Sequence, residues 1–426
     1  MADNHVVIVG GGIAGLAASI YLARGGRTVT LFEKRRYLGG RAVTHLRHGY
    51  RFNLGPHAFY RGGEGSKVLA ELGIPVRGGV PKVRGIALYG PQRYRLPAGI
   101  FSMWASGLLS FVDKLEASKL LWRIRRLKKP AQFAAMSARQ WLDQYVTRQR
   151  VRETLEAMLR LATYCDDMGK INAGAALNQL RLAMRGVIYV DEGWQKIVDA
   201  LHSSAVAAGV NFVTSSRVVG IQHDGSVRAI EIGGLEYEKQ SETQSYLRPQ
   251  KGEARGTRLA AETVLLAVEP STARDLIGEV SWPEMTPLLL STLDVALSKL
   301  PQPKKTFAVG IDKPLYFSVH SRWAQLTPKG GALIHVSRYG GGDETELETL
   351  LDEMQPGWRE SVVHCRFLPS MVVSNAVMPP APATRPAATT PIRGLYLAGD
   401  WVGDIGLLSD AALASARAAA KAILAA

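Results

Sequence analysis

The chain has 426 residues, which is enough for two or three domains and a large core. Hydrophobic residues make up 46% and charged residues 21%, the range of globular proteins, and no low-complexity tract interrupts the chain. The net charge of +15 is compatible with nucleic acid, an anionic membrane surface, anionic ligands or only a solvated basic surface. No nucleic-acid recognition module accompanies the charge, so we expect no nucleic-acid partner.

Cys165 and Cys365 are far apart in sequence, which excludes a disulfide framework and a Cys-x-x-Cys redox site. The nine histidines show no metal-ligand spacing, and we expect no metal. No stretch reaches the 18 apolar residues of a membrane span, and the first apolar run is too short for a signal peptide. We therefore expect a cytoplasmic protein that is either soluble or attached peripherally to the inner face of the membrane.

The first forty residues predict a strand, a glycine turn, a helix and a second, parallel strand. The apolar run 6–9 leads into Gly10–Gly15, and a second apolar run ends before Glu33. In such a unit the three spaced glycines allow a tight turn, the approach of a pyrophosphate, and close packing of helix on strand. The helix N-terminus offers free N–H groups to phosphates. Glu33 would bind the adenosine ribose and repel a 2′-phosphate, which argues against NADP and leaves NAD and FAD open.

Gly39, Gly40 and Arg41 follow the second strand and would bring backbone and a guanidinium back towards the pyrophosphate. A dinucleotide fingerprint closed by an acid and followed by x-x-G-G-R resembles the flavin-containing amine oxidoreductase superfamily, and within it the phytoene desaturase-like proteins. The resemblance implies FAD as the cofactor. Residues 50–57 resemble the segment that runs beside the isoalloxazine ring, although Asn53 stands where the family more often has an acid.

The region after about residue 90 changes character. Residues 98–129 are aromatic and apolar, then basic, and predict helices outside the nucleotide fold. They would form either an interfacial helix that docks on an anionic membrane or a buried helix with a solvated basic end. Two more amphipathic helices are predicted at 137–145, with Ser137 as its cap, and at 150–161.

The middle of the chain predicts a return to the first domain. A helix at 193–208 and strands at 210–213 and 218–221 match this part of the family, and Val218 matches the position whose backbone meets the adenine. The polar stretch 235–257 is expected to be an exposed hairpin, and 261–267 a buried strand. A second sheet is then predicted from strands at 292–296, 305–309, 315–319, 332–337 and 362–367, with a helix at 344–354 and a linker at 379–391.

The end of the chain carries a second specific motif. A buried strand breaks at Gly399-Asp400, and a long alanine-rich helix opens after Gly406. In the family the matching aspartate bonds the ribityl chain or pyrophosphate, and the helix N-terminus faces the flavin N1–O2 edge. Asp410 lies in the first turn, where it would favour the helix dipole. The cofactor contacts expected from all these segments are Gly10, Gly12, Ile13, Ala14, Gly15, Glu33, Lys34, Gly39, Gly40, Arg41, Gly55, Pro56, His57, Val218, Gly399, Asp400, Gly406, Leu407 and Leu408.

The catalytic group is not identified by the sequence. His57 is the best placed ionisable residue, with packing as the alternative to catalysis. Amine oxidases of the superfamily often place a lysine near the flavin N5, but Lys304 and Lys305 are expected to begin a strand at the surface. Candidates for lining a substrate pocket, with core packing as the alternative, are Tyr164, Tyr316, His320 and Trp401.

The predicted fold is α/β, with a Rossmann-type FAD-binding domain of the two-dinucleotide-binding, glutathione-reductase-like kind and an interleaved α+β substrate domain. The FAD-binding domain would take residues 1–90, 186–275 and 385–426, and the substrate domain 91–185 and 276–384. The expected activity is dehydrogenation or desaturation of a hydrophobic, isoprenoid substrate by hydride transfer to N5, with oxygen or a quinone as electron acceptor. The alternatives are an amine- or protoporphyrinogen-oxidase-like flavoenzyme and a non-enzymatic protein that keeps FAD as a structural element.

Overall fold

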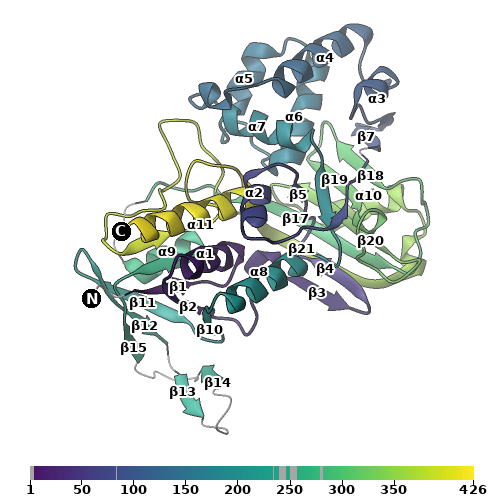
Figure 1. The fold of residues 1–426 in the computed structure, drawn as a ribbon. Helices are drawn as coiled ribbons and strands as arrows, with labels where there is room; N and C mark the ends of the chain where they lie inside the picture. Colours follow the sequence, from purple (N-terminus) through teal and green to yellow (C-terminus); the bar gives the residue numbers. More distant parts are fainter. Residues whose placement is uncertain (1–3, 83, 234, 239–245, 250–256, 279–281) are drawn as a thin grey trace.

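The computed structural model describes residues 4–82, 84–233, 235–238, 246–249, 257–278 and 282–426. A layered nucleotide-binding part holds the two ends of the chain, a large mixed sheet lies beside it, and a group of helices caps the far side (Figure 1).

A five-stranded parallel sheet with the order β10-β2-β1-β16-β22 forms the centre of the nucleotide-binding part. Successive side chains of a strand point to opposite faces, so Val6 and Ile8 pack under helices while Val7 and Val9 face the other side. Both faces are therefore buried, as parallel sheets require. The strands are β1 (His5–Val9), β2 (Thr28–Phe32), β10 (Asn211–Val213), β16 (Val264–Leu266) and β22 (Leu395–Leu397).

Helices cover one face of this sheet, and a small antiparallel sheet covers the other. The helices are α1 (Ile13–Arg24), α2 (Glu64–Glu71), α8 (Gln195–Ala207) and α11 (Leu408–Ala425). The second layer contains β11 (Val218–His223), β12 (Val227–Ile232), β15 (Thr257–Ala260) and α9 (Pro270–Ile277). Because strands from the start, middle and end of the chain pair in one sheet, this part is discontinuous in sequence, and the predicted α/β fold is confirmed.

A seven-stranded mixed sheet has the order β21-β17-β20-β19-β18-β7-β8, and α10 (Glu344–Met354) packs on one of its faces. Since β7 pairs with β18, the hairpin β7–β8 belongs to this sheet, and the boundary predicted at residue 90 falls inside that hairpin. The strands are β7 (Ile86–Tyr89), β8 (Gln92–Arg95), β17 (Leu288–Leu297), β18 (Phe307–Gly310), β19 (Leu315–Val319), β20 (Ala332–Tyr339) and β21 (Val362–Ser374).

The helical cap lies over one end of the mixed sheet (Figure 1). It contains α3 (Ile100–Trp104), α4 (Phe111–Arg125), α5 (Ala138–Tyr145), α6 (Gln149–Thr163) and α7 (Ala173–Ala183). Ser137 caps α5 as its sequence predicts, because the hydroxyl accepts the amide of Gln140. Within the described parts of the chain, every helix is too short or too polar to span a bilayer.

Short strands connect these layers: β3 (Thr44–Arg47), β4 (Tyr50–Asn53), β5 (Phe59–Tyr60), β6 (Gly78–Gly79) and β9 (Val187–Val190). The predicted hairpin at 235–257 contains the antiparallel pair β13 (Leu235–Glu238) and β14 (Tyr246–Pro249), which projects from the molecule in Figure 1. Residues 239–245 and 250–256 of that prediction lie outside the described residues.

Candidate functional site

The first glycine loop joins β1 to α1 and is shaped by contacts that only glycine allows. Gly10 has φ +109°, and a Cβ there would lie 2.5 Å from the Ala267 carbonyl oxygen. A Cβ on Gly15 would lie 2.0 Å from the Gly10 carbonyl oxygen, so the helix could not pack so closely on the strand. At Gly12, by contrast, nothing among the described residues lies within 4 Å of a Cβ. That position borders open space.

Gly12 is also the N-cap of α1 and has no side chain that could bond the first-turn amides, including those of Ile13 and Ala14. These N–H groups and the positive end of the helix dipole therefore face the open space at Gly12. Such a helix N-terminus binds phosphate groups.

Glu33 ends β2 beside this loop and is 9% exposed. One carboxylate oxygen accepts the Gly11 amide at 2.8 Å and the other accepts the Arg35 amide at 2.9 Å. A carboxylate offers about four acceptor positions, so Glu33 retains capacity for the hydroxyls of a ribose. Lys34, expected to contact the cofactor, is exposed to solvent.

The second glycine pair crosses over the first loop. The Gly39 amide donates to the Gly11 carbonyl at 2.8 Å, and a Cβ on Gly40 would lie 3.5 Å from the Gly12 Cα. Gly39 and Gly40 both have positive φ, which explains why this crossing uses glycine. The chain then enters a short 3₁₀ turn, Gly40–Ala42, which contains Arg41.

Arg41 forms an ion pair of 2.9 Å with Asp400, which is 4% exposed at its side chain. Asp400 also accepts the backbone amide and the side-chain amide of Asn375, at 3.0 and 2.9 Å. Burial alone would raise the pKa of Asp400, but Arg41 and these hydrogen bonds hold the pKa below its usual value. The two terminal motifs thus meet in one charged contact.

The loop from Asp400 to α11 is held by a buried arginine that the sequence reasoning assigned to a linker. Arg385 is 5% exposed and donates to the carbonyls of Gly403, Asp400 and Gly406, at 2.7, 2.8 and 3.0 Å. Burial lowers its pKa to about 10. The planar guanidinium has five N–H donors in a fixed fork, which suits it to three carbonyls at once.

Helix α11 begins under backbone strain. Its N-cap residue Leu407 offers no side-chain acceptor, and Leu408 has φ +56°, the left-handed region that a leucine rarely adopts. Strain of this kind persists where the surrounding structure fixes it, and it often marks a functional site. The first-turn amides of α11 are therefore held in a fixed place next to Gly406.

Asp410 lies in the first turn of α11, but its carboxylate caps a different helix, α2. Its Oδ1 accepts the Gly65 amide at 2.9 Å and so caps α2. A Cβ on Gly63 would lie 2.0 Å from the Asp410 Oδ2, so a side chain there would displace the carboxylate. Asp410 is 1% exposed, and burial raises its pKa to about 6. The predicted dipole role is therefore only part of what this carboxylate does.

The segment 215–218 lies along the other side of Glu33. The Ser216 amide donates to the Glu33 carbonyl at 3.0 Å, and the Ser215 amide donates to the Arg35 carbonyl at 2.9 Å. Val218 follows at the start of β11 and packs in the core with Phe32. This position beside the end of β2 is compatible with the prediction that the Val218 backbone contacts the adenine.

The glycine loops and the two helix N-termini fit a flavin dinucleotide. The Arg41 side chain keeps 43% of its surface accessible while it pairs with the buried Asp400. The open space at Gly12 provides room where a pyrophosphate would approach. Among the described residues, no group of three or more His, Cys, Asp and Glu side chains is arranged to hold a metal ion.

Gly55, Pro56 and His57 lie between the nucleotide-binding part and the mixed sheet. A Cβ on Gly55 would lie 3.2 Å from the Thr292 methyl group, and the Tyr164 hydroxyl donates to the Pro56 carbonyl at 3.1 Å. His57 and Tyr164 both keep part of their surface accessible deep inside the protein. Burial lowers the pKa of His57 to about 4, so its imidazole is neutral at pH 7 and a weak base.

The mixed sheet carries an unusual row of polar side chains on the face opposite α10. Residues at alternate positions of β17, β20 and β21 share this face, and pairing places Asp294 opposite both His335 and Arg366. The intervening residues Leu293 and Val336 pack against α10. We name this set the polar row; its members are Thr292, Asp294, His335, Ser337 and Arg366.

Charge and hydrogen bonds hold the polar row together. Asp294 and His335 are each 0% exposed, and the His335 Nδ1 lies 2.6 Å from the Asp294 Oδ1. Arg366 pairs with the other carboxylate oxygen and also donates to the Asn53 carbonyl. Burial opposes ionisation of Asp294, but His335 and Arg366 hold its pKa below the usual value. The Thr292 hydroxyl lies 3.1 Å from the same carboxylate.

A group of aromatic side chains extends this row towards β9. The His320 ring lies 4.4 Å from the His335 ring and stacks on Tyr189 at 3.8 Å, and its Nε2 is hydrogen-bonded to the Tyr316 hydroxyl at 3.2 Å. Burial, together with the two neighbouring histidines, lowers the pKa of His320 well below its usual value. Tyr316 and His320 are thus buried beside the polar row, whereas Tyr164 keeps part of its surface accessible.

Trp401, a predicted pocket residue, lies instead in the protein core. Its side chain is 0% exposed, its ring packs near Trp282, and its indole N–H donates to the Val268 carbonyl at 2.8 Å. It belongs to the core beneath the parallel sheet because its large ring is enclosed there. Lys305 donates to the Glu353 carbonyl at 3.2 Å and Lys304 is exposed, so both stand at the surface end of β18 as expected.

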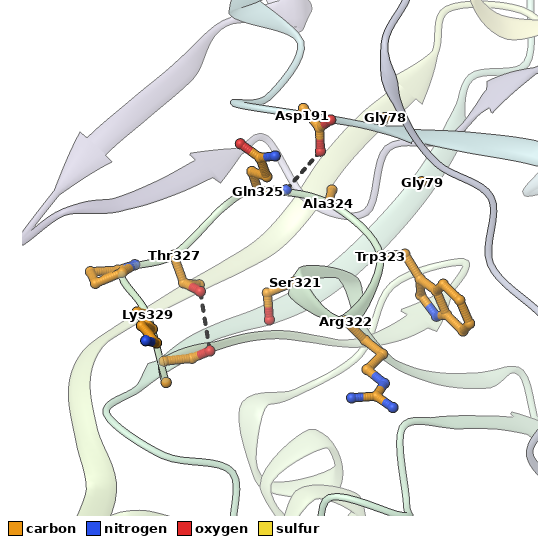
Figure 2. Close-up of a pocket in the computed structure, with 13 residues that line it drawn as sticks. Gly78, Gly79, Asp191, Ser321, Arg322, Trp323, Ala324, Gln325, Thr327 and Lys329 are labelled. Atoms are coloured by element: carbon orange, nitrogen blue, oxygen red, sulfur yellow. Dashed lines mark hydrogen bonds between the residues drawn. The ribbon is translucent and has the colours of Figure 1, made fainter.

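A polar surface depression of about 690 Å³ lies elsewhere, beside the loop that follows β19. Figure 2 shows Asp191 bonded to the Gln325 amide along one part of it, while the Trp323 and Arg322 side chains lie to the other side. The residues that line it belong to 78–79, 191 and 321–331, and none is a predicted site residue. It is therefore separate from the glycine loops.

Residues 8–72 match the NAD(P)-binding Rossmann-like domain family. A 4,4'-diaponeurosporene oxygenase of Staphylococcus aureus (strain USA300) is 38% identical over 53 residues, 12% of this chain and 11% of that protein. A carotenoid 3,4-desaturase of Haloarcula japonica is 48% identical over 56 residues, 13% of this chain and 11% of that protein. These matches cover only a small part of each relative's length.

The solved structures match over nearly the whole chain at low identity. An oxidoreductase from Methanosarcina mazei is 16% identical, with a TM-score of 0.71 over 99% of this chain and 100% of that one. A putrescine oxidase bound to putrescine is 14% identical, with a TM-score of 0.70 over 99% of both chains. A Rab GDI from Plasmodium falciparum has a TM-score of 0.60 at 14% identity over 98% of both chains. The chain therefore shares its overall fold with these proteins, which include a putrescine oxidase and a Rab GDI.

Proposed function

We propose that the protein is an FAD-dependent oxidoreductase that dehydrogenates a hydrophobic, isoprenoid substrate. The ion pair between Arg41 and Asp400 is the observation that carries the proposal, because it joins the two terminal motifs. Bound FAD would accept a hydride from the substrate at N5. The electrons would then leave to oxygen or a quinone.

The chain's own residues divide the binding of FAD between them. The first-turn amides of α1 would bind the pyrophosphate, and Glu33 would bind the adenosine ribose. Arg41 would add positive charge, and the first-turn amides of α11 would face the part of the flavin where negative charge develops.

An apolar core in the helical cap supports a hydrophobic substrate. This core contains side chains from α3, α4, α6 and α7, and it extends to Leu407 at the start of α11. Leu408 and Tyr164 pack against the same core. A substrate that lay between the cap and the proposed flavin would therefore meet apolar side chains, in surroundings that exclude water.

The polar row makes an amine substrate less suitable. A cationic ammonium group needs an unpaired carboxylate or an aromatic cage. The buried carboxylate beside the flavin-side segment, Asp294, is already paired with His335 and Arg366. A second cation there would face Arg366 without a free counter-charge.

The proposed substrate would come from a membrane, and an exposed apolar patch on α3 and α4 supports peripheral attachment. We define this cap patch as Phe101, Trp104, Phe111, Val112, Leu115 and Trp122, which are between 42% and 91% exposed. Lys114 and Lys119 lie on α4, and Arg126, directly after it, stacks its guanidinium over the Trp122 ring at 4.4 Å. Aromatic side chains with a basic rim suit an anionic lipid surface.

A glycine variant tests the cofactor proposal without disturbing the fold. Gly12→Ala places a methyl group where the protein leaves open space, at φ −75° and ψ 177°, which alanine adopts freely. The apoprotein should therefore keep its melting temperature, whereas FAD affinity should fall about tenfold or more because the methyl group meets the pyrophosphate. Gly107→Ala, where a Cβ would make ordinary contact with Tyr94, is the matched control. Unchanged FAD affinity in Gly12→Ala would remove the proposed site.

The substrate class is tested by anaerobic reduction of the bound flavin. Phytoene in detergent micelles should bleach the flavin absorbance, whereas putrescine and protoporphyrinogen IX should not. Bleaching by putrescine alone would replace the proposal with amine oxidation. A protein that binds FAD and is reduced by none of the three would support the non-enzymatic alternative.

A further inference from the structure

Arg385 orients a whole stretch of backbone in one direction. Its buried guanidinium donates to the carbonyls of Asp400, Gly403 and Gly406 at 2.8, 2.7 and 3.0 Å. In a planar trans peptide, the carbonyl of one residue and the N–H of the next point in opposite directions. The three N–H groups that follow these carbonyls therefore point away from Arg385. The last of them belongs to Leu407, the N-cap residue of α11.

The position of this loop connects Arg385 to the proposed FAD site. The backbone carbonyl of Asp400 accepts from Arg385, and the carboxylate of the same residue pairs with Arg41. Arg41 directly follows Gly40, where a Cβ would lie 3.5 Å from the Gly12 Cα. The other end of the loop leads into the first turn of α11. The guanidinium thus holds both ends of a segment that joins two groups of proposed cofactor contacts.

Arg385 keeps its positive charge inside the protein. Burial lowers its pKa to about 10, which still leaves the guanidinium protonated at pH 7. Two carboxylates act on it electrostatically. Asp400 is already paired with Arg41, and Asp404 is exposed, so that water and salt screen its charge. The peptide dipoles of the loop point their positive ends away from the guanidinium, so cation and dipoles together give the far side of the loop a positive potential.

We propose, on the basis of the proposed function, that Arg385 is a positioning residue that raises the electron affinity of the bound flavin. It does not touch the flavin but acts through the loop 400–407, whose N–H groups it turns towards the cofactor. A hydride that adds to N5 leaves one negative charge on the flavin ring. The positive potential on this side of the loop stabilises that charge, so it favours the reduced form over the oxidised form.

A purely structural role of Arg385 predicts a different result. If the guanidinium only held the loop in place, its loss would lower the stability of the protein and weaken oxidised and reduced FAD equally. The ratio of the two affinities would then stay the same. An electrostatic role changes this ratio, because only the reduced ring carries the extra negative charge.

Sulfite is a probe that reports on the charge near the flavin without any substrate. Its sulfur lone pair forms a bond to N5 of the oxidised flavin, and the ring takes up the negative charge. The wild-type holoprotein should form this adduct, seen as a loss of the visible flavin absorbance. In Arg385→Met the dissociation constant for sulfite should rise about tenfold or more. Arg385→Lys keeps the charge but not the fork of donors, so its dissociation constant should rise less.

The two-electron reduction potential of the bound FAD is the second readout. A tenfold loss of affinity for the reduced flavin relative to the oxidised flavin corresponds to a fall of about 30 mV. Equilibration with a reference dye should show a fall of at least this size in Arg385→Met and a smaller fall in Arg385→Lys.

Asp404→Asn tests the sign of the effect without altering a buried group. Asp404 is exposed and acts electrostatically on Arg385, so its neutralisation should tighten sulfite binding, by about twofold. Arg393→Met, on an exposed arginine outside the loop, is the matched control and should leave both readouts unchanged. If Arg385→Met does not fold, the opposite shifts expected in Arg385→Lys and Asp404→Asn decide the matter.

The outcomes separate this inference from the proposed function. Unchanged sulfite affinity and potential in Arg385→Met, together with bleaching by phytoene, would overturn the inference and leave the proposed function in place. A wild-type flavin that forms no sulfite adduct would also overturn the inference. If both readouts respond to Arg385 as expected but no lipid bleaches the flavin, the proposed substrate class fails and the inference stands. A chain that binds no FAD removes both.

Discussion

Arg41 and Asp400, from opposite ends of the chain, form an ion pair of 2.9 Å in which Asp400 is almost fully buried. Replacing Arg41 by methionine removes the cation from this carboxylate and leaves the two hydrogen bonds from Asn375 in place. We expect the apoprotein to lose about 1–3 kcal/mol of unfolding free energy, less than for a fully buried pair because Arg41 is 43% accessible. Urea unfolding measures this loss.

FAD affinity should fall in the same variant, because an unpaired carboxylate would repel the pyrophosphate. The double variant Arg41→Met, Asp400→Asn should recover part of the lost stability, since it removes the stranded charge. Arg36→Met, on an exposed arginine of the same segment, is the control. A double variant no more stable than Arg41→Met would show that the pair does not act as a unit.

Glu33 should affect FAD and FMN differently. Its carboxylate accepts the amides of Gly11 and Arg35, and it stands where an adenosine ribose would lie. Glu33→Gln should weaken FAD binding about tenfold, the value of one charge-assisted hydrogen bond. FMN lacks the adenosine half, so its affinity should stay within about twofold of the wild type. Fluorescence titration of both flavins distinguishes a ribose contact from a general distortion of the loop.

The glycine loop, the strand–helix–strand unit around it and the long terminal helix could be predicted from the sequence because each rests on local rules. Spaced glycines, a strand-ending acid and period-two apolar runs describe contacts among near neighbours. The ion pair of Arg41 with Asp400 was implied only indirectly, since nothing local in residues 39–41 names a partner beyond residue 390.

Other site residues could not be predicted from the sequence, for physical reasons. Arg385 sits in a proline-rich stretch typical of a linker, and only tertiary structure shows that its guanidinium binds three carbonyls. The polar row could have been predicted in part, because Thr292 and Asp294, like His335 and Ser337, occupy alternate positions of mostly apolar strands. Alternating polar residues in strands buried on both faces indicate a functional face.

Arg385 should be needed for the order of the loop that leads into α11. Arg385→Lys keeps the charge but cannot reach the carbonyls of Asp400, Gly403 and Gly406 together. We expect a loss of about 2–4 kcal/mol in unfolding free energy, because buried carbonyls lose charge-assisted bonds. Hydrogen exchange of the Leu408 and Ser409 amides should quicken.

The exchange measurement separates a local role from a global one. Arg393→Lys, on an exposed arginine a few residues away, should change neither stability nor exchange. If Arg385→Lys lowers stability but leaves exchange at Leu408 and Ser409 unaltered relative to the core, the arginine stabilises the fold without shaping the α11 terminus.

Asp410 should make the protein less stable as the pH rises from about 4 to about 6. Burial raises the pKa of Asp410 to about 6 in the folded state, above its unfolded value near 3.8. In this window the unfolded chain has released its proton while the folded chain still holds it, so unfolding becomes easier as the pH increases. Above about pH 6 the effect is complete and amounts to roughly 3 kcal/mol.

The matched variants for Asp410 are Asp410→Asn and Asp404→Asn. Asparagine at 410 cannot ionise. The advantage of the wild type over Asp410→Asn in unfolding free energy should therefore shrink, or reverse, as the pH rises from 4 to 6. Asp404 is exposed, and its replacement should leave the pH profile of the wild type unaltered. A difference that is constant with pH would show that Asp410 is ionised throughout.

The cap patch should bind anionic membranes. Phe111, Leu115 and Trp122 lie on one face of α4, and Phe101 of α3 is 91% exposed beside them. We expect the protein to sediment with vesicles that contain phosphatidylglycerol at low salt, and to be released at high salt because Lys and Arg near the surface contribute about 1 kcal/mol each.

Replacing Phe101, Phe111 and Trp122 together by serine should lower the partition coefficient at least tenfold, since about 2 kcal/mol of apolar burial is lost for each large side chain. Leu46→Ser, which alters a 60% exposed leucine outside the patch, should bind as the wild type does. Binding that persists in the triple variant, or that is equal on vesicles of phosphatidylcholine alone, would place the basic charge of this chain in a solvated surface with no role at the bilayer.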